Sequence, residues 1–337
     1  MILTIENKYF AASNTVSGFV SYYDDIFGRC DEIYVIKGGS GTGKSRFMRE
    51  VAEHYLKNEE NANIEYFYCS FDPDSLDGII VDRRMAVIDG TSPHVYEPTL
   101  PGAKENMVDL GAFWDSRALM AKRLGLLSLM KQKKEHFRRA YGYLASYGEL
   151  MKVREGMLLP FVDRLRVRAD AAKRVSELSV GEKCEERIRP TAAFGRRGVV
   201  DFFDAERRGD VKANAVGGLG YLWLSEIIAE SKKFSLPMEI AYDPLFAQRP
   251  YRVTVGDGAV FSLYDVDMTD HMTCDIGNTI DRAEQIGNCA DTILDMASAE
   301  LSEAANVHFN IEEIYVSAMD FEKKEKYTKK FLKELQI

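Results

Sequence analysis

The residues from position 38 to position 45 combine flexible glycines with one cation and three hydroxyls. They read Gly-Gly-Ser-Gly-Thr-Gly-Lys-Ser and match the whole pattern G-x-x-x-x-G-K-S/T. In this pattern the glycines let successive backbone N–H groups point at one spot, and the lysine adds positive charge there. These groups suit a polyphosphate. The pattern therefore predicts a phosphate-binding loop, made by Gly38, Gly39, Ser40, Gly41, Thr42, Gly43, Lys44 and Ser45.

The segments on both sides of the loop have the pattern that such a loop requires. The run Ile33–Ile36 is typical of a strand. After the loop, apolar residues recur at helical spacing, namely Phe47, Met48, Val51, Ala52, Tyr55 and Leu56. A loop between a strand and a helix directs the helix N-terminus, with its partial positive charge, at the phosphates. ATP or GTP is the expected ligand.

Two oxygen ligands for Mg²⁺ are expected near this loop. Lys44 would reach the β- and γ-phosphates, and the Ser45 hydroxyl would bind the metal ion. Asp89 ends the apolar run Met85–Ile88, which is the pattern of a Walker B carboxylate and predicts a second metal ligand. The alternative for Asp89 is a helix-cap or turn aspartate before Gly90.

The residue that activates water is expected away from Asp89, because Gly90 follows it where many ATP hydrolases have a glutamate. Ligands of open α/β sheets bind at the carboxyl ends of strands. Asp74, Asp77 and His94 follow such strands, and with Lys44 they are the candidate catalytic residues. The alternatives are solvated turn aspartates and a hydrogen-bonded structural histidine. Arg83, Arg84, Arg196 and Arg197 are candidates for a stimulatory arginine.

Length and composition indicate an ordinary globular protein. At 337 residues, with 46% hydrophobic and 29% charged residues, two domains are expected. The N-terminus lacks the features of a signal peptide, and no apolar run approaches membrane-spanning length, so we expect a cytoplasmic protein without membrane contact. The five cysteines are scattered and form no C-x-x-C pair, which supports neither a disulfide framework nor a zinc site.

Four segments of the first half reappear in the second half in the same order. The matched pairs are Gly18–Asp24 with Gly198–Asp204, Gly38–Gly41 with Gly217–Gly220, Glu65–Pro73 with Glu239–Pro244, and Met85–Asp89 with Val260–Asp265. This order predicts a pseudo-repeated α/β fold. The second glycine run continues into Tyr221–Leu224, which lacks the lysine and the hydroxyl. We therefore expect the second half not to hold a triphosphate productively.

Helical patterns follow each α/β half. Residues 115–178 are interpreted as two long helices in a hairpin, and residues 280–335 look similar. The expected domains are 1–114 (P-loop half), 115–180 (basic helical hairpin), 181–272 (second α/β half) and 273–337 (helical segment).

The predicted hairpin is basic, whereas the chain as a whole is acidic. The net charge of the chain is −9, yet residues 115–174 contain 15 Lys/Arg against 6 Asp/Glu. Aromatic residues lie among its basic residues, which would suit nucleic acid or an acidic partner. A solvated helical face above core aromatics explains the same pattern.

Three segments together resemble a poorly characterised bacterial family of paired P-loop ATPases: Gly38–Ser45, Cys69–Gly78 and Ala86–His94. Tyr315–Phe321 is similar to the closing helix of that family. The resemblance implies two nucleotide-binding halves, each followed by helices, with ATP binding and presumed hydrolysis. It applies to the loop residues, to Asp89 and more loosely to Asp74, Asp77 and His94. The chain departs from the family pattern at Tyr221–Leu224.

The sequence thus predicts an α/β P-loop NTPase with a parallel sheet and long helical hairpins. The expected activity is Mg²⁺-dependent ATP hydrolysis coupled to a conformational change. A kinase that phosphorylates a small molecule and a non-catalytic ATP-binding switch are the alternatives. No N-K-x-D motif for guanine occurs at a suitable place, which favours ATP over GTP.

Overall fold

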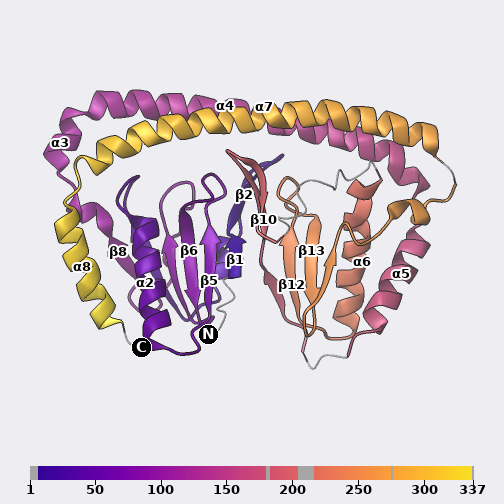
Figure 1. Ribbon diagram of the computed structural model, residues 1–337, viewed down its shortest axis with the longest axis horizontal. Helices are drawn as coiled ribbons and strands as arrows, with labels where there is room; N and C mark the ends of the chain where they lie inside the picture. Colours follow the sequence, from indigo (N-terminus) through magenta and orange to yellow (C-terminus); the bar gives the residue numbers. More distant parts are fainter. Residues whose placement is uncertain (1–6, 180–182, 204–215, 275, 336–337) are drawn as a thin grey trace. The chain divides into compact units, whose positions relative to one another are not determined.

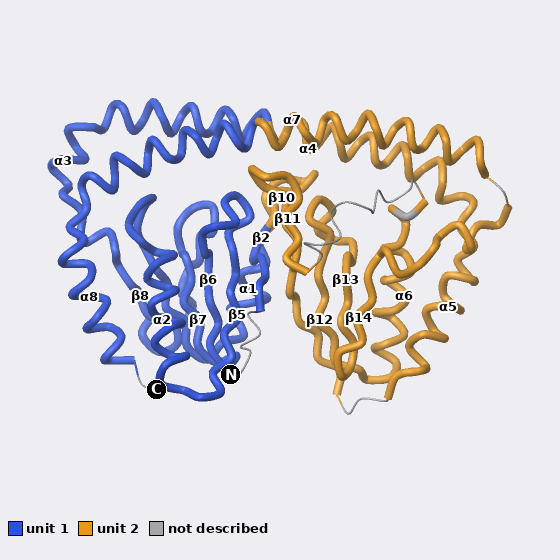
Figure 2. Tube along the Cα trace, viewed as in Figure 1, with its two compact units in different colours: residues 1–12, 21–139, 300–337 blue, residues 13–20, 140–299 orange. Residues whose placement is uncertain are grey.

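The computed structural model describes residues 7–179, 183–203, 216–274 and 276–335 (Figure 1). The chain divides into two compact units, blue and orange in Figure 2. Unit 1 comprises residues 1–12, 21–139 and 300–337, and unit 2 comprises residues 13–20 and 140–299. We describe each unit by itself.

The unit boundaries differ from the four consecutive segments expected from the sequence. Two of them fall inside long helices, α4 (Arg123–Leu158) and α7 (Gly277–Val316). Each of these helices therefore contributes residues to both units, and a division at the helix ends does not separate the compact parts.

Unit 1 is built around a six-stranded sheet in the order β1-β5-β6-β7-β4-β8. Its strands are β1 (Asn7–Phe10), β4 (Glu32–Lys37), β5 (Ile64–Tyr68), β6 (Leu76–Val81), β7 (Met85–Asp89) and β8 (Glu105–Asp109). The pairs β1–β5, β7–β4 and β4–β8 are parallel, whereas β6 is antiparallel to both neighbours. The α/β class is confirmed, with a mixed sheet in place of the expected parallel one.

Helix α2 (Lys44–Asn58) follows β4 through the loop and packs against β6 and β7. The residues that face the core recur at helical spacing, as the sequence predicts, and are Phe47, Met48, Val51, Ala52 and Tyr55. Helix α8 (Phe321–Glu334) adds Phe331, whose ring contacts the rings of Tyr34 and Phe47. Burial of this apolar face fixes α2, and with it the loop that precedes it.

Unit 2 contains a four-stranded sheet in the order β14-β13-β12-β9. Its strands are β9 (Glu186–Ile188), β12 (Met238–Tyr242), β13 (Pro250–Val255) and β14 (Ala259–Ser262). The β9–β12 pair is parallel, and β12–β13 and β13–β14 are antiparallel. This is the pairing pattern of β1, β5, β6 and β7 in unit 1. Helix α6 (Gly220–Lys233) packs against β13, as α2 packs against β6.

The two sheets also share a β-bulge. In unit 1, Phe67 pairs with Gly78 but Tyr68 pairs with Leu76, so Asp77 is the extra residue of β6. In unit 2, the register shifts at the equivalent point of β12, between Ala241 and Tyr242, and leaves Tyr251 as the extra residue of β13. A bulge changes the direction of the side chain that it carries.

The matched sequence segments fall on corresponding elements of the fold. Strand β5 of unit 1 corresponds to β12 of unit 2, and β7 to β14. The ribbon of β2 (Ala12–Thr15) and β3 (Gly18–Ser21) corresponds to the ribbon of β10 (Ala192–Gly195) and β11 (Gly198–Asp201), and apart from Ala12 and Ser21 both ribbons belong to unit 2. This agreement supports the internal repeat expected from the sequence. Asp204, which closes one matched segment, lies outside the described residues.

The second glycine run is wound into helix instead of forming an open loop. When Gly38–Gly41 is aligned with Gly217–Gly220, Trp223 takes the position of Lys44 and Leu224 that of Ser45. The run forms η3 (Gly217–Leu219) and the start of α6. Trp223 and Leu224 are both buried, and Trp223 Nε1 donates to Asp170 Oδ2 at 2.7 Å. Core side chains thus occupy the places of the lysine and the hydroxyl.

The expectation that residues 115–178 form a hairpin of two long helices is wrong. This stretch forms α3 (Ser116–Ala121), the long α4, η2 (Leu159–Phe161) and α5 (Arg164–Ser176). The neighbour of α4 is α7: within unit 1, Lys133 lies against His308 and His136 against Glu300. Residue numbers rise along α4 as they fall along α7, so the two helices are antiparallel. The partner of α4 thus comes from far along the chain, where local sequence patterns cannot indicate it.

Replacing Trp223 by Ala should lower the free energy of unfolding by about 3–5 kcal/mol, because the ring is 1% exposed and its removal leaves a cavity. Urea denaturation followed by circular dichroism measures this change. Leu165→Ala on α5, where the side chain is 79% exposed, is the control and should change it by less than about 0.5 kcal/mol. Equal effects of the two substitutions would contradict the assignment of Trp223 to the core.

Candidate functional site

The loop between β4 and α2 has the backbone conformation that its glycines allow. Gly41 and Gly43 have φ angles of +71° and +79°, in the left-handed region that favours glycine. Gly43 is the N-cap of α2, and as a glycine it has no side-chain acceptor for the first N–H groups of the helix. The helix N-terminus therefore keeps donors and partial positive charge for an anion.

The ammonium of Lys44 lies against acceptors of the loop and of β7. Its Nζ donates to the carbonyl oxygens of Gly38, at 3.1 Å, and Gly39, at 2.8 Å. It also lies 3.5 Å from Asp89 Oδ2. The structure thus brings together Lys44 and Asp89, as the sequence analysis expects.

Strand pairing explains the position of Asp89. Strands β4 and β7 are adjacent and parallel, with Asp89 opposite Ile36, so the loop and the carboxylate leave the sheet at the same edge. Asp89 Oδ1 accepts hydrogen bonds from the backbone N, at 2.9 Å, and the hydroxyl, at 2.6 Å, of Thr91. Burial raises the pKa of Asp89, while the Lys44 charge and the Thr91 hydrogen bonds act in the opposite direction.

Ser45 is also fixed by a contact with the sheet. Its Oγ accepts a hydrogen bond from the backbone N of Leu76 at 3.1 Å. A hydroxyl oxygen has two lone pairs, so this contact orients the group and leaves it able to bind a cation.

Asp77 and His94 form a buried pair. Asp77 Oδ2 lies 3.0 Å from His94 Nε2, and the side chains are 6% and 5% exposed. Tyr23, in α1 (Tyr23–Phe27), stacks on the His94 ring with centroids 4.8 Å apart, and its hydroxyl donates to the Asp77 carbonyl oxygen at 3.1 Å. Burial opposes protonation of the ring, but the charge and hydrogen bond of Asp77 outweigh it, so the pKa of His94 is raised. Leu76, the neighbour of Asp77 in the chain, donates its backbone N–H to Ser45 Oγ at 3.1 Å, so the pair lies near the loop.

The remaining candidates lie elsewhere. Asp74 is exposed in the turn after β5, where its carbonyl oxygen accepts from Arg49 at 3.0 Å, so it does not join the buried pair. Arg83 and Arg84 lie in the turn before β7, at the opposite end of this strand from Asp89. Residues 196–197 belong to unit 2, in the turn between β10 and β11.

Two helices add polar side chains that the sequence analysis did not assign to the site. Lys133 on α4 donates from Nζ to His308 Nδ1 on α7 at 2.9 Å, and its ammonium lies 5.5 Å from the centroid of the Phe71 ring. Burial and the charge of Lys44 lower the pKa of Lys133. Burial and the charges of Lys133 and Lys44 lower the pKa of His308 to about 4. The two helices therefore share an electrostatic environment with the loop lysine.

The end of α7 also packs on the loop itself. A Cβ atom at Gly41 would lie 2.7 Å from Val316 Cγ2, and one at Gly39 would lie 3.1 Å from the ring of Trp114. The loop glycines are therefore needed for this close packing as well as for their backbone angles. From the sequence, the residues around Lys133 fit either a surface for nucleic acid or an acidic partner, or a solvated helical face. Nothing in their pattern shows that α7 covers α4 here.

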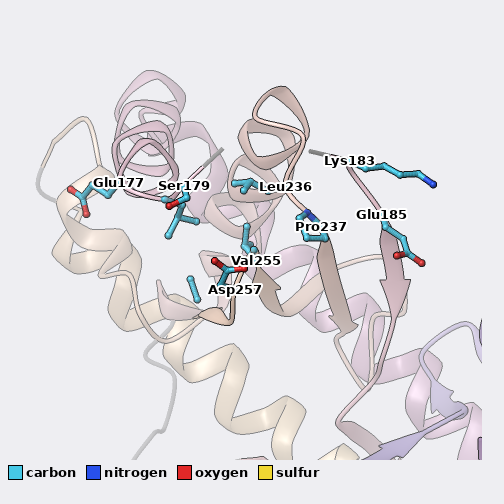
Figure 3. A pocket seen from close by; sticks show the side chains of 11 residues that line it. Glu177, Ser179, Lys183, Glu185, Leu236, Pro237, Val255 and Asp257 are labelled. Carbon is cyan, nitrogen blue, oxygen red and sulfur yellow. The ribbon is translucent and has the colours of Figure 1, made fainter. Parts of the chain in front are cut away.

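A pocket of about 700 Å³ lies in unit 2 (Figure 3). Glu185 and Pro237 line this pocket where β9 and β12 begin, and Asp257 lines it at the turn between β13 and β14. These are the amino ends of the parallel pair, whereas ligands of α/β sheets bind at the carboxyl ends. The pocket is therefore not the counterpart of the loop site in unit 1.

Comparisons with protein families, with curated proteins and with solved structures found no match for this chain. The assignment of this site depends on its own geometry and on the sequence motifs. Among the described helices, none combines the length and the apolar character needed to span a membrane.

The ring of His308 should titrate near pH 4 in NMR spectra, below the usual value of about 6.5. Lys133→Met removes a nearby positive charge and should raise the pKa of His308. Since the folded state binds this proton more weakly than the unfolded state, stability should fall as the pH drops from about 6.5 to about 4. His308→Gln should remove this part of the pH dependence. A His308 titration near pH 6.5 that Lys133→Met leaves unchanged would contradict the burial of this pair.

Proposed function

We propose that the chain is a magnesium-dependent P-loop nucleoside triphosphatase that binds and hydrolyses ATP in unit 1. The observation that carries this proposal is the convergence of three groups at one sheet edge. They are the loop at the N-terminus of α2, the ammonium of Lys44 and the carboxylate of Asp89. The likeness to paired P-loop ATPases in the sequence motifs supports the same proposal.

The groups around the loop suit a triphosphate. The partners of the Lys44 ammonium are two carbonyl oxygens and one carboxylate, and phosphate oxygens are stronger acceptors that can replace the carbonyls. The backbone N–H groups of the loop and the N-terminus of α2 supply the other contacts. These donors are fixed by the fold, so they need little rearrangement to bind the ligand.

Ser45 and Asp89 are the residues that would hold Mg²⁺. Both offer oxygen atoms, which this ion prefers, and both are oriented by neighbours, Leu76 for the hydroxyl and Thr91 for the carboxylate. The bound ion would neutralise charge on the phosphate oxygens. The protein's own contribution is to keep these two oxygens beside Lys44.

His94 and Asp77 are the residues that we assign to water activation. A general base must lie near the reacting phosphate and be held in a fixed orientation. The Asp77 carboxylate and the stacked Tyr23 ring orient the imidazole. In this assignment His94 accepts a proton from the attacking water, and Asp77 stabilises the resulting imidazolium.

Lys133 is the residue through which α4 and α7 would respond to the nucleotide. Its ammonium is partly buried and is hydrogen-bonded to His308. The positive charge of Lys44 contributes to its lowered pKa. A γ-phosphate bound by Lys44 would attract Lys133 away from the His308 ring. The contact between α4 and α7 would then change with the state of the nucleotide, which is the coupled conformational change of this proposal.

Unit 2 has no equivalent site in this proposal. Trp223 and Leu224 are core residues, and the glycine run before them is helical. The retained strand order and the lost loop chemistry favour a structural role for this unit.

Lys44→Ala should weaken ATP binding by about 100-fold, equivalent to about 3 kcal/mol, because it removes the charge that pairs with the phosphates. Isothermal titration calorimetry with Mg²⁺ and ATP measures the affinity. Lys57→Ala is the matched control, since Lys57 is 75% exposed in the last turn of the same helix. Unchanged affinity in Lys44→Ala would contradict the proposal.

Product analysis in the same experiments separates hydrolysis from its alternatives. Release of inorganic phosphate that stops on addition of EDTA is the expected result. Phosphate transfer to an added acceptor would indicate a kinase, and tight ATP binding without turnover would indicate a switch.

Lys133→Ala should lower kcat/KM for ATP by about 10-fold, because the variant lacks a cation that the γ-phosphate would bind. Lys131→Ala, on the exposed face of the same helix, should leave kcat/KM unchanged. Steady-state assays of phosphate release compare the two variants. The role of Lys133 would be wrong if both variants behaved like the wild type.

A further inference from the structure

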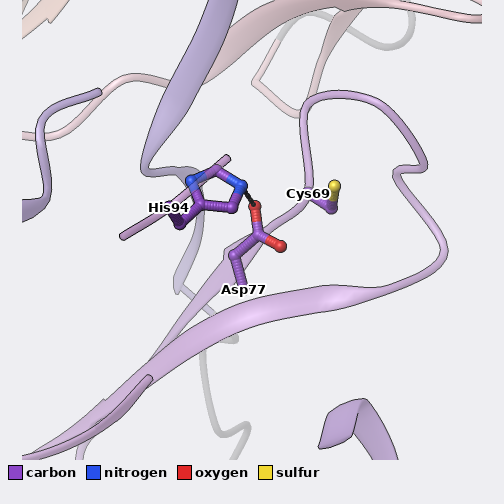
Figure 4. Close-up of side chains that lie close together, drawn as sticks. All are labelled: Cys69, Asp77 and His94. Carbon is purple, nitrogen blue, oxygen red and sulfur yellow. Dashed lines mark ion pairs between the residues drawn. The ribbon is translucent and has the colours of Figure 1, made fainter. Parts of the chain in front are cut away.

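Three different potential metal ligands converge beside the loop site. The Cys69 thiol, an Asp77 carboxylate oxygen and a His94 ring nitrogen all lie within 4.8 Å of one another (Figure 4). They come from three places in the chain: the residue after β5, the bulge of β6 and the segment after β7. We propose that these residues bind a divalent transition-metal ion, with Zn²⁺ as the best fit.

The ligand types select the class of ion. A thiolate, an imidazole and a carboxylate are the ligands that Zn²⁺ takes in proteins, at distances of about 2.0–2.3 Å. Mg²⁺ and Ca²⁺ prefer sites made of oxygen atoms. The cluster therefore differs in kind from the Ser45–Asp89 set. Three protein ligands leave a fourth tetrahedral position for water, as in catalytic zinc sites.

The local structure holds these groups in place. The Cys69 backbone N donates to the Ser75 carbonyl oxygen at 3.0 Å, which closes the turn between β5 and β6. The bulge sets the direction of Asp77, and Tyr23 contacts both His94 and Asp77. Support of this kind around the ligands is common in protein metal sites. Asp77 and His94 are 4% and 5% exposed, whereas Cys69 is half-buried.

Unit 2 shows that the fold does not require this cluster. By strand register, Asp243 takes the place of Cys69 and Tyr251 that of Asp77. Asp243 Oδ1 accepts from the backbone N of Leu245 and Phe246, at 2.8 and 2.9 Å, and the Tyr251 hydroxyl donates to Asp201 at 2.9 Å. The same backbone frame is therefore satisfied by ordinary turn and core contacts. Among the described residues, the combination of thiol, carboxylate and imidazole occurs in unit 1.

Metal binding would also affect the rate of ATP hydrolysis, a consequence that rests on the proposed function. An ion bound to the His94 nitrogen occupies the lone pair that would accept the proton from water. Zn²⁺ should therefore slow ATP hydrolysis without weakening ATP binding at the loop.

Titration of the metal-free full-length protein with Co²⁺, without nucleotide, tests the site directly. The expected result is one ion per chain, with a thiolate-to-cobalt charge-transfer band and the intense visible bands of tetrahedral cobalt. Zn²⁺ should displace Co²⁺ and remove these bands. It should also raise the melting temperature of the wild type, because an ion that binds only the folded state stabilises it.

Variants identify the ligands. Cys69→Ser should abolish the charge-transfer band, and His94→Gln and Asp77→Asn should each weaken Co²⁺ binding by about 10-fold or more. Cys274→Ser and Asp74→Asn are the matched controls, since both residues are exposed and lie outside the cluster, and both should bind like the wild type. Lys44→Ala should also keep the cobalt bands. This result separates the metal site from the nucleotide site.

Two results would overturn the inference. One is the absence of a charge-transfer band in wild-type protein that circular dichroism shows to be folded. The other is Co²⁺ binding of unchanged affinity and spectrum in Cys69→Ser. Either result would mean that Asp77 and His94 form an ion pair beside an uninvolved thiol.

Discussion

The pairing of β4 with β7 is the constraint on which the site in unit 1 depends. Because the two strands are adjacent and parallel, the loop that follows one and the carboxylate that ends the other meet at one edge of the sheet. The Lys44–Asp89 contact of 3.5 Å is the direct result. Helix α2 keeps its N-terminus at this edge because its apolar face is buried on the sheet. The geometry of the loop is thus a consequence of core packing some distance away.

The two units have a common backbone arrangement but different polar side chains. Four strands of each sheet share their order, their pairing directions and the position of a bulge, whereas β4 and β8 of unit 1 have no counterpart among the described strands of the unit 2 sheet. The polar groups differ: Trp223 replaces the loop lysine and packs in a core, and Tyr251 replaces Asp77. The same frame is thus found with either set of side chains, so the fold alone does not require the charged groups of unit 1. In our proposal these groups bind a ligand.

Much of unit 1 is predictable from the sequence because its signals are local. The loop motif, the strand before it and the apolar spacing from Phe47 to Tyr55 lie within one short stretch. The internal repeat is visible because related segments keep their order. The expected role of Asp89 in metal binding remains a prediction, although its position beside Lys44 is as the motif implies.

The parts that sequence patterns did not reveal all depend on distant contacts. The pairing of α4 with α7 joins Lys133 to His308, which are 175 positions apart, and no periodicity predicts such a contact. The Cys69–Asp77–His94 cluster has no recognisable spacing, since a bulge and two turns bring the ligands together. Asp74 and Asp77 looked equivalent in the sequence, yet the turn exposes the first and the bulge buries the second.

The stoichiometry of nucleotide binding tests the central claim most directly. The account predicts that equilibrium dialysis with Mg²⁺ and labelled ATP gives one nucleotide per chain, bound at the loop of unit 1. Two nucleotides per chain would contradict the loss of the second loop. No bound nucleotide at saturating concentration would contradict the account as a whole.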